Sequence, residues 1–355
     1  MNSPLDVIIS GAGIIGVSLA LELRGRGAHV LVLDSGPPGR EASSAAAGML
    51  AAADPMTPPA LRPLAMASAE MFPAYVQKME AAADMQVDFR QLGTIELAAE
   101  TAAPHEYKRL SSADLQRLEP SLTLKNHARS LLSQELSAFF VQEDSVDPHL
   151  LMQAALAAAQ KIGIEIRGNA TVTNTTACDG KVEVLSESRY IAKSFVNCQG
   201  AWSGAPVRPR KGQMLYLQPQ TSVLQHVLRT PEVYIVPRST GKVLIGATVE
   251  DVGFDKSVEP EAIDMLLTLA KHYLPEFAAA PITQSWAGLR PGTPDDLPII
   301  GPTDIPGAFI ASGHFRNGIL LAPITAKIMA DLLEGRSPSL DISSFSPARF
   351  SSKTV

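Results

Sequence analysis

The chain has 355 residues, of which 46% are hydrophobic, and its formal net charge is −6. A chain of this length and apolar content can bury a large core, which excludes a disordered protein and favours two domains over one. The negative charge offers no positive field for a nucleic acid or an anionic membrane surface, so we expect neither as a partner.

The N-terminal residues predict a strand–helix–strand unit of a parallel sheet. Residues 5–10 have the pattern of a strand, residues 14–26 that of a helix ended by Gly27, and residues 30–33 that of a second strand. Met1 leads into the first strand without a signal peptide, and the two cysteines are too few for a disulfide framework. No segment is apolar for long enough to cross a bilayer. We therefore expect a cytoplasmic protein.

The turn between the first strand and the helix, residues 11–16, has the sequence GAGIIG and matches the GxGxxG pattern. Its glycines let the backbone approach a pyrophosphate, which the N–H groups and dipole of the helix N-terminus attract. Asp34 ends the next strand, where a carboxylate can bind ribose hydroxyls. The alternative is a tight turn followed by a solvated aspartate. The pattern does not distinguish NAD from FAD.

The next segment, residues 40–50, offers the hydroxyls of Ser43 and Ser44 and then a run of small side chains. This composition suits a flat ring and a pyrophosphate lying against the start of a helix. The alternative is an ordinary alanine-rich helix capped by serine.

Further along the chain, Asp147 can cap a helix that has Pro148 at its first position and runs to residue 162. Alternating residues that end in turns predict antiparallel strands in the second half of the chain. The elements expected after residue 50 are helices at residues 61–83, 147–162 and 320–333, and strands at residues 94–98, 164–166, 213–217, 233–237 and 243–247.

This order of elements predicts an α/β fold in which a Rossmann-like domain is interrupted twice by a second, α+β domain built on an antiparallel sheet. We assign residues 1–80, 140–205 and 288–355 to the dinucleotide-binding domain. Residues 81–139 and 206–287 are assigned to the substrate domain.

Several motifs along the chain together resemble the bacterial glycine oxidases, which belong to the D-amino acid oxidase group of flavoenzymes and often serve thiamine biosynthesis. The motifs are GAGIIG, residues 42–50 (ASSAAAGML), residues 233–238 (VYIVPR), residues 286–293 (WAGLRPGT) and residues 313–323 (GHFRNGILLAP). The resemblance implies non-covalently bound FAD under a substrate domain. It also implies oxidation of glycine to an imine that is hydrolysed to glyoxylate and ammonia, with O2 reduced to hydrogen peroxide. Members are commonly homotetramers, so a homo-oligomer, a tetramer or a dimer, is expected.

The resemblance also implies site residues. Arg290 would bind the substrate carboxylate, the Tyr234 hydroxyl would be its second anchor, and the backbone carbonyl of Arg316 would face the amino group. Taken alone, Tyr234 is more often a core residue and Arg290 a residue of a surface turn. The residues implied to bind FAD are Gly11, Gly13, Ile14, Ile15, Gly16, Asp34, Ser35, Ala42, Ser43, Ser44, Ala47, Gly48, Met49, Val172, Gly200, Gly313, His314, Arg316, Asn317, Gly318, Ile319 and Leu320.

These residue types suit the chemistry. A guanidinium matches a carboxylate in a fork and so orients a molecule as small as glycine. FAD itself accepts the hydride at N5, so no side-chain acid or base is required, and N–H groups near Asn317 could stabilise the resulting negative charge. No metal is expected, because His314 has no second ligand at suitable spacing. Cys198 should pack near the dinucleotide without a covalent bond to it.

Two positions depart from the glycine oxidase pattern: Glu232 stands where those enzymes carry histidine, and Val249 where they carry methionine. On a strand, Glu232 and Tyr234 would share one face, and a carboxylate in the pocket would favour neutral or amine-bearing substrates over acidic ones. The alternatives left open are a D-amino acid or sarcosine oxidase, a dehydrogenase that uses an acceptor other than O2, and a flavin-binding protein without turnover.

Overall fold

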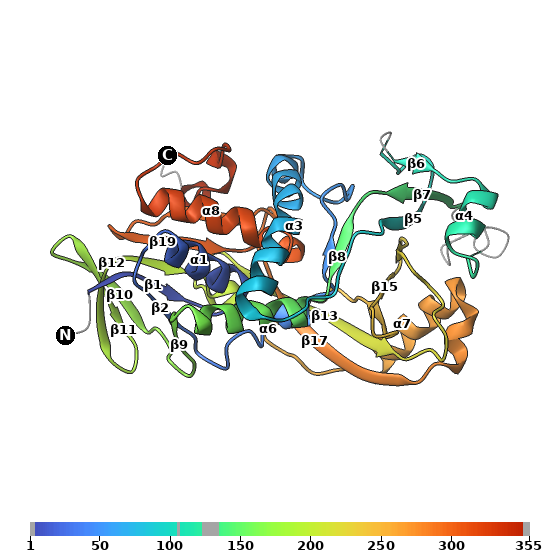
Figure 1. Ribbon diagram of the computed structural model, residues 1–355, viewed down its shortest axis with the longest axis horizontal. Coiled ribbons are helices and arrows are strands. Elements are labelled where there is room, and N and C mark those ends of the chain that lie inside the picture. The colour runs from blue at the N-terminus through green and yellow to red at the C-terminus, as the bar shows by residue number, and fades with distance from the viewer. Residues whose placement is uncertain (1–3, 105–106, 123–134, 351–355) are drawn as a thin grey trace.

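The computed structural model describes residues 4–104, 107–122 and 135–350. Two large sheets form the two halves of the molecule, the first beside the N-terminus and the second at the opposite end (Figure 1). The predicted α/β class, with a second part built on a mainly antiparallel sheet, is confirmed. Among the described residues, no helix combines the length and apolar character needed to span a bilayer.

The first sheet contains the predicted parallel unit. Strand β1 lies between β2 and β12 and is parallel to both, and β19 extends the parallel part on the far side of β12. The core strands β1 and β2 are buried on both faces. Helices pack on one face, and the other face packs against residues of β11, β12 and β19 and the loop at Ala170. The strands of this sheet are β1 (Leu5–Ser10), β2 (Val30–Leu33), β9 (Glu165–Arg167), β10 (Asn174–Cys178), β11 (Lys181–Leu185), β12 (Arg189–Asn197), β18 (Ile299–Pro302) and β19 (Ala308–Ser312).

Helices α1 (Ile14–Gly25), α3 (Arg62–Ala83), α6 (Pro148–Lys161) and α8 (Ala322–Leu333) pack on one another and on the first sheet (Figure 1). Helix α6 begins as predicted, because the Asp147 carboxylate accepts hydrogen bonds from the amides of His149 at 2.8 Å and Leu150 at 3.2 Å. Its alanines at 154, 155, 158 and 159 are fully buried, and such small side chains allow helices to approach closely.

The second sheet has the order β17-β13-β16-β15-β14-β5-β7-β6 and is antiparallel except between β14 and β5. One face packs against helix α7, and the other face turns toward the first half of the molecule. Its strands are β5 (Thr94–Ala98), β6 (Lys108–Arg109), β7 (Ser137–Val141), β13 (Arg208–Leu217), β14 (Val227–Arg229), β15 (Tyr234–Pro237), β16 (Val243–Gly246) and β17 (Ile282–Gly292).

A small third sheet contains β3 (Met49–Leu50), β4 (Phe89–Arg90) and β8 (Asp144–Val146), and the short helix α2 (Ala42–Ala45) precedes β3. Helices α4 (Ser112–Leu118) and α7 (Pro260–Tyr273) belong to the second half, because each connects two strands of the second sheet. The 3-10 helices are η1 (Pro59–Leu61), η2 (Gly200–Trp202), η3 (Pro275–Ala279), η4 (Phe315–Asn317), η5 (Ser343–Phe345) and η6 (Pro347–Phe350). The division into domains stays a prediction, and β7 and β17 run across its boundaries at residues 140 and 288.

Candidate active site

A cavity of about 950 Å³ lies between the two sheets and is lined from both sides. From the first half come the start of α1, the end of β2, residues 41–49 and η4, and from the second half come β13, β15 and β17. Ligand sites commonly form where two such units meet. The cavity can be divided into a dinucleotide end at α1 and a substrate end at the second sheet.

The dinucleotide end is built on the N-terminus of α1. Gly13 caps this helix without a side chain, and the first turn contains no acidic residue, so its N–H groups can attract an anion. The amide of Ile14 donates to the Ser43 hydroxyl at 2.9 Å, which brings residue 43 to the start of the helix. A Cβ on Gly13 would lie 3.0 Å from the same hydroxyl. The residues here fit a pyrophosphate.

Gly11 and Gly16 make the close packing of this turn possible. Gly11 has a φ of 105°, and a Cβ there would overlap the carbonyl of Cys198, the residue after β12. A Cβ on Gly16 would overlap the carbonyl of Gly11. Both glycines therefore let strand and helix approach, and Gly16 itself lies behind the cavity wall.

Asp34 lies on the wall at the end of β2, where it was predicted. Its two carboxylate oxygens accept hydrogen bonds from the amides of Ala12 at 2.6 Å and Gly36 at 2.9 Å. These bonds tie the strand end to the glycine turn. A carboxylate has about four acceptor sites, so two remain for ribose hydroxyls.

The alanine-rich segment forms only one short helix, α2, rather than a long one, and its small residues line the cavity. Two side chains of the second sheet hold it. Trp286 donates from Nε1 to the Ala45 carbonyl at 3.1 Å, and Arg238 donates to the Ala47 carbonyl at 2.6 Å. The sequence analysis predicted neither contact, because no local pattern indicates a contact between residues so far apart in sequence.

Arg290 stands on β17 at the substrate end, not in a surface turn. Its guanidinium lies over Gly212 of β13, where an added Cβ would be 2.5 Å from the guanidinium carbon. Nη1 donates to the carbonyl of Thr248 at 3.2 Å and of Lys211 at 3.5 Å. These carbonyls orient the group while Arg290 lines the cavity.

Tyr234 on β15 lies beside Arg290, with its hydroxyl over Gly246 of β16. Burial raises the pKa of Tyr234 above its usual value of 10.0, although Arg290, a hydrogen bond to it, Arg316 and Arg238 act in the opposite direction. The hydroxyl therefore stays protonated at neutral pH and can donate to an anion.

Residues 314–319 form the wall between the two ends. The Arg316 guanidinium lies 5.1 Å from the Phe315 ring, and Asn317, Gly318 and Ile319 continue toward α8. Burial lowers the pKa of His314 to about 3, and its Nε2 is 3.2 Å from the Thr325 hydroxyl. This histidine is neutral at physiological pH and packs against α8.

Five of the predicted cofactor residues lie outside the wall: Gly16, Ser44, Val172, Gly313 and Leu320. The Ser44 hydroxyl turns away and donates to the Gly39 carbonyl. Val172 packs beside the first sheet, and Leu320 is 1% exposed in the core. Gly313 has a φ of 73°, and a Cβ there would lie 2.6 Å from the Thr293 side chain, so this position needs glycine for its backbone conformation.

The far wall carries acidic residues that surround Arg229. Arg229 is hydrogen-bonded to Glu96, to Glu143 at 2.9 Å and to Tyr107 at 3.3 Å. Burial alone would lower the pKa of Arg229, but the carboxylates raise it, so the guanidinium remains charged. Sequence reasoning missed this cluster, because no local spacing joins its members.

Glu232 and Tyr234 both line the cavity, but Glu232 does not lie on a strand as expected, because β15 begins at Tyr234. It lies in a bend before β15, where backbone alternation does not hold. Its Oε2 accepts a hydrogen bond from the Tyr273 hydroxyl, and its Oε1 is buried without a partner among the residues that the structure describes. Val249 also lines the cavity and is 51% exposed.

Within residues 4–104, 107–122 and 135–350, no group of three or more His, Cys, Asp or Glu side chains is arranged to hold a metal ion. Cys198 lines the wall as expected, and burial raises the pKa of its thiol well above the usual range, so it is not a reactive thiolate.

Comparison with known proteins agrees with this geometry. The family profile described as FAD dependent oxidoreductase, DAO, matches residues 6–332. The chain is 34% identical over 362 residues to the bifunctional protein ThiO/ThiG of Trichormus variabilis, covering 97% of this chain and 55% of that protein. It is 32% identical to the glycine oxidase of Geobacillus kaustophilus, covering 98% of both.

A crystal structure of glycine oxidase from Geobacillus kaustophilus superimposes with a TM-score of 0.90 at 29% identity, covering 98% of this chain and 99% of that one. The chain spans about half the length of the ThiO/ThiG relatives that it matches.

Proposed function

The chain belongs to the DAO family of FAD-dependent oxidoreductases, and from this premise we propose that it oxidises the C–N bond of glycine or a similarly small amino acid. The observation that carries the proposal is the meeting of Arg290 and Tyr234 at one end of a cavity whose other end fits a dinucleotide. A guanidinium beside a protonated hydroxyl is suited to a carboxylate.

FAD would lie along the cavity, with its pyrophosphate at the start of α1, its ribose near Asp34, and its ring system near residues 45–49 and 314–319. Bound FAD supplies the acceptor for the hydride that leaves the substrate Cα. Non-covalent binding is proposed because the Cys198 thiol remains protonated.

The residues of the chain would act on the substrate by position. The Arg290 fork binds the carboxylate and, with the Tyr234 hydroxyl, restricts its rotation. The backbone carbonyl of Arg316 would accept a hydrogen bond from the amino group. Held at both ends, glycine has one Cα–H bond that can point into the flavin side of the cavity.

No side chain is required as a general base. His314 is neutral at physiological pH, and its Nε2 is already within hydrogen-bond distance of the Thr325 hydroxyl. The substrate amine would therefore enter in its neutral form or lose its proton to water. Its product, an imine, would be hydrolysed to glyoxylate and ammonia, with O2 reduced to hydrogen peroxide. We also propose a cytoplasmic homo-oligomer, a tetramer or a dimer.

The substrate range is expected to exclude acidic side chains, because Asp54 and Glu232 line the cavity, whereas the charge of Glu96 is compensated by Arg229. Purified protein with a flavin spectrum should be mixed without oxygen with glycine, sarcosine, D-alanine, D-proline and D-aspartate. Bleaching by glycine, and peroxide release when air returns, are the expected results. Efficient bleaching by D-aspartate would refute the acidic-wall argument, and bleaching without peroxide would indicate a dehydrogenase.

A further inference from the structure

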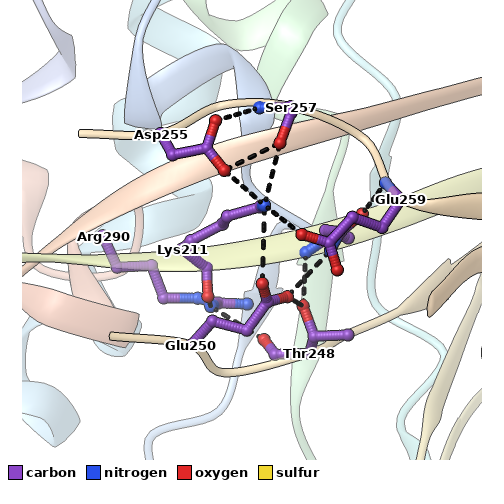
Figure 2. Close-up of polar contacts among 8 residues, drawn as sticks. Lys211, Thr248, Glu250, Asp255, Ser257, Glu259 and Arg290 are labelled. Atoms are coloured by element: carbon purple, nitrogen blue, oxygen red, sulfur yellow. Dashed lines mark hydrogen bonds and ion pairs between the residues drawn. The ribbon is translucent and has the colours of Figure 1, made fainter. Parts of the chain in front are cut away.

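Lys211 is fully buried, which is rare for lysine unless its charge is paired. It stands on β13 next to Gly212, and because strand side chains alternate, it points to the face opposite Arg290. Its Nζ lies 3.1 Å from Asp255, 3.3 Å from Glu259 and 3.5 Å from Glu250 (Figure 2).

These three carboxylates belong to one segment, residues 248–259, which we call the strap. The strap leaves β16, crosses the end of β13 and leads into α7. It also contacts the first half of the molecule. The rings of Phe254 and Trp202 are 5.3 Å apart, and Lys256 binds Glu41 at 3.0 Å. Trp202, Glu41 and Val249 line the cavity, so the strap lies at its edge.

A short chain of contacts joins Lys211 to Arg290. The backbones of Lys211 and Glu250 exchange hydrogen bonds at 3.0 and 2.9 Å. The Glu250 carboxylate accepts from Gln213 at 2.9 Å and from the Thr248 hydroxyl. The Thr248 carbonyl then accepts from Arg290 at 3.2 Å (Figure 2).

Charge makes this arrangement depend on Lys211. One ammonium faces three carboxylates, which would repel one another if it were removed. Hydrogen bonds from Ser257 and the neighbouring Lys211 lower the pKa of Asp255 to about 2, so this carboxylate stays ionised. Gln213 makes a second connection between β13 and the strap, because its side-chain oxygen accepts a hydrogen bond from the Glu259 amide at 2.7 Å.

We infer that Lys211 is a positioning residue: from the outer face of the sheet it holds the strap on β13 and so fixes the Thr248 carbonyl that orients Arg290 toward the substrate carboxylate. The inference rests on the proposed function only in taking Arg290 as the carboxylate anchor. A purely structural lysine would change stability without changing the orientation of the anchor.

The test compares flavin-loaded Lys211→Met with wild type. Acetate, which has a carboxylate and no amine, is titrated against the flavin absorbance, and amide hydrogen exchange is followed in the strap. We expect the acetate Kd and the KM for glycine to rise about tenfold, kcat to stay within about threefold, and exchange in residues 248–259 to accelerate.

Two further variants provide matched comparisons. Lys211→Arg keeps the charge and should recover most of the acetate affinity. Lys256→Met removes a cation from the same strap but leaves the Lys211 cluster intact, and because exposed pairs contribute little, its acetate Kd should stay within about twofold of wild type. If Lys211→Met does not fold, Asp255→Asn should give a smaller shift in the same direction.

Unchanged acetate affinity in a folded Lys211→Met protein would overturn the inference, whatever the strap exchange shows. A drop in thermal stability alone, with KM unchanged, would overturn it as well. A wild-type protein that binds acetate but oxidises no amine would contradict only the proposed function, because the acetate comparison between the variants does not require turnover.

Discussion

The two ends of the cavity are constructed differently. The dinucleotide end is formed largely by backbone and glycine within the first fifty residues, with Gly13 opening α1 and Asp34 closing β2. The substrate end combines charged and phenolic side chains from separate strands, with Arg290 over Gly212 and Tyr234 over Gly246. A site formed by consecutive residues can be predicted from their spacing, whereas a site assembled by strand pairing cannot.

The two ends should also respond differently to change. At the dinucleotide end, small residues leave space for the cofactor beside the backbone N–H groups, so a methyl group added there should weaken cofactor binding most. At the substrate end, the orientation of buried charge matters, so loss or displacement of a side chain has the larger effect. Substitutions at the two ends should therefore separate cofactor binding from substrate binding.

The largest effect is expected from Gly13→Val. The added methyl groups would fill the space in front of α1, where overpacking costs about 1–3 kcal/mol and each lost N–H contact to a charged phosphate about 1.5–3 kcal/mol. FAD affinity, measured by titration of the apoprotein, should fall by about a hundredfold or more.

Gly25→Val is the matched control, because it makes the same change at the other, exposed end of α1. It should keep its flavin and lose no helix stability, because valine has a higher helix propensity than glycine and the added side chain meets no close neighbour. A Gly13→Val protein that purifies with the wild-type ratio of FAD would show that the pyrophosphate does not lie at this helix.

Much of the fold could be predicted because its signals are local. The glycine turn, the Asp147 cap of α6 and the short apolar runs of β15 and β16 each depend on neighbouring residues. The bend at Glu232 could not be predicted, since the Tyr273 hydroxyl that holds it comes from α7. The contacts of Lys211 and Arg238 likewise depend on pairings between distant segments.

The candidate site divides in the same way. Gly13 and Asp34 lie on the cavity wall at the positions of the dinucleotide motif, and Ser43, from the next segment, lies beside them. Val172 and Leu320, which only the family resemblance suggested, pack away from the cavity. Strands β13 and β16 lie between the strands that carry Arg290 and Tyr234, and the two side chains extend over glycines of these intervening strands. No spacing in the sequence contains that information.

The second effect in size is expected from Arg290→Ala. Removing one partner of a charge-assisted contact costs about 2–5 kcal/mol, so the KM for glycine should rise by a factor of thirty or more while the flavin spectrum is kept. Steady-state kinetics and the visible spectrum measure the two separately. An unchanged KM would place the carboxylate anchor elsewhere.

Gly212→Ala is expected to have a smaller effect at the same end. The new Cβ would lie 2.5 Å from the Arg290 guanidinium carbon, so the side chain must shift although its charge is retained. We expect a loss of about 1–2 kcal/mol in acetate binding, with FAD retained. Gly241→Ala, in a turn of the same sheet, is a control outside the cavity wall: because Gly241 has a φ of 79°, this variant should lose stability and keep the wild-type acetate affinity. Equal affinity in Gly212→Ala and wild type would mean that the orientation of Arg290 is unimportant.

The smallest effect is expected from Tyr234→Phe, which removes one hydroxyl and should weaken acetate binding by about 1 kcal/mol.

Because burial raises the pKa of Tyr234 above 10.0, the hydroxyl should remain a donor, and wild-type acetate affinity should not fall between neutral pH and pH 10 through this group. Above pH 10 the folded state keeps a proton that the unfolded state loses, so Tyr234 makes the free energy of unfolding decrease with pH, and the phenylalanine variant should lack this contribution. Denaturant titrations of both proteins above pH 10 measure the difference, and identical slopes would show that Tyr234 is not buried as described.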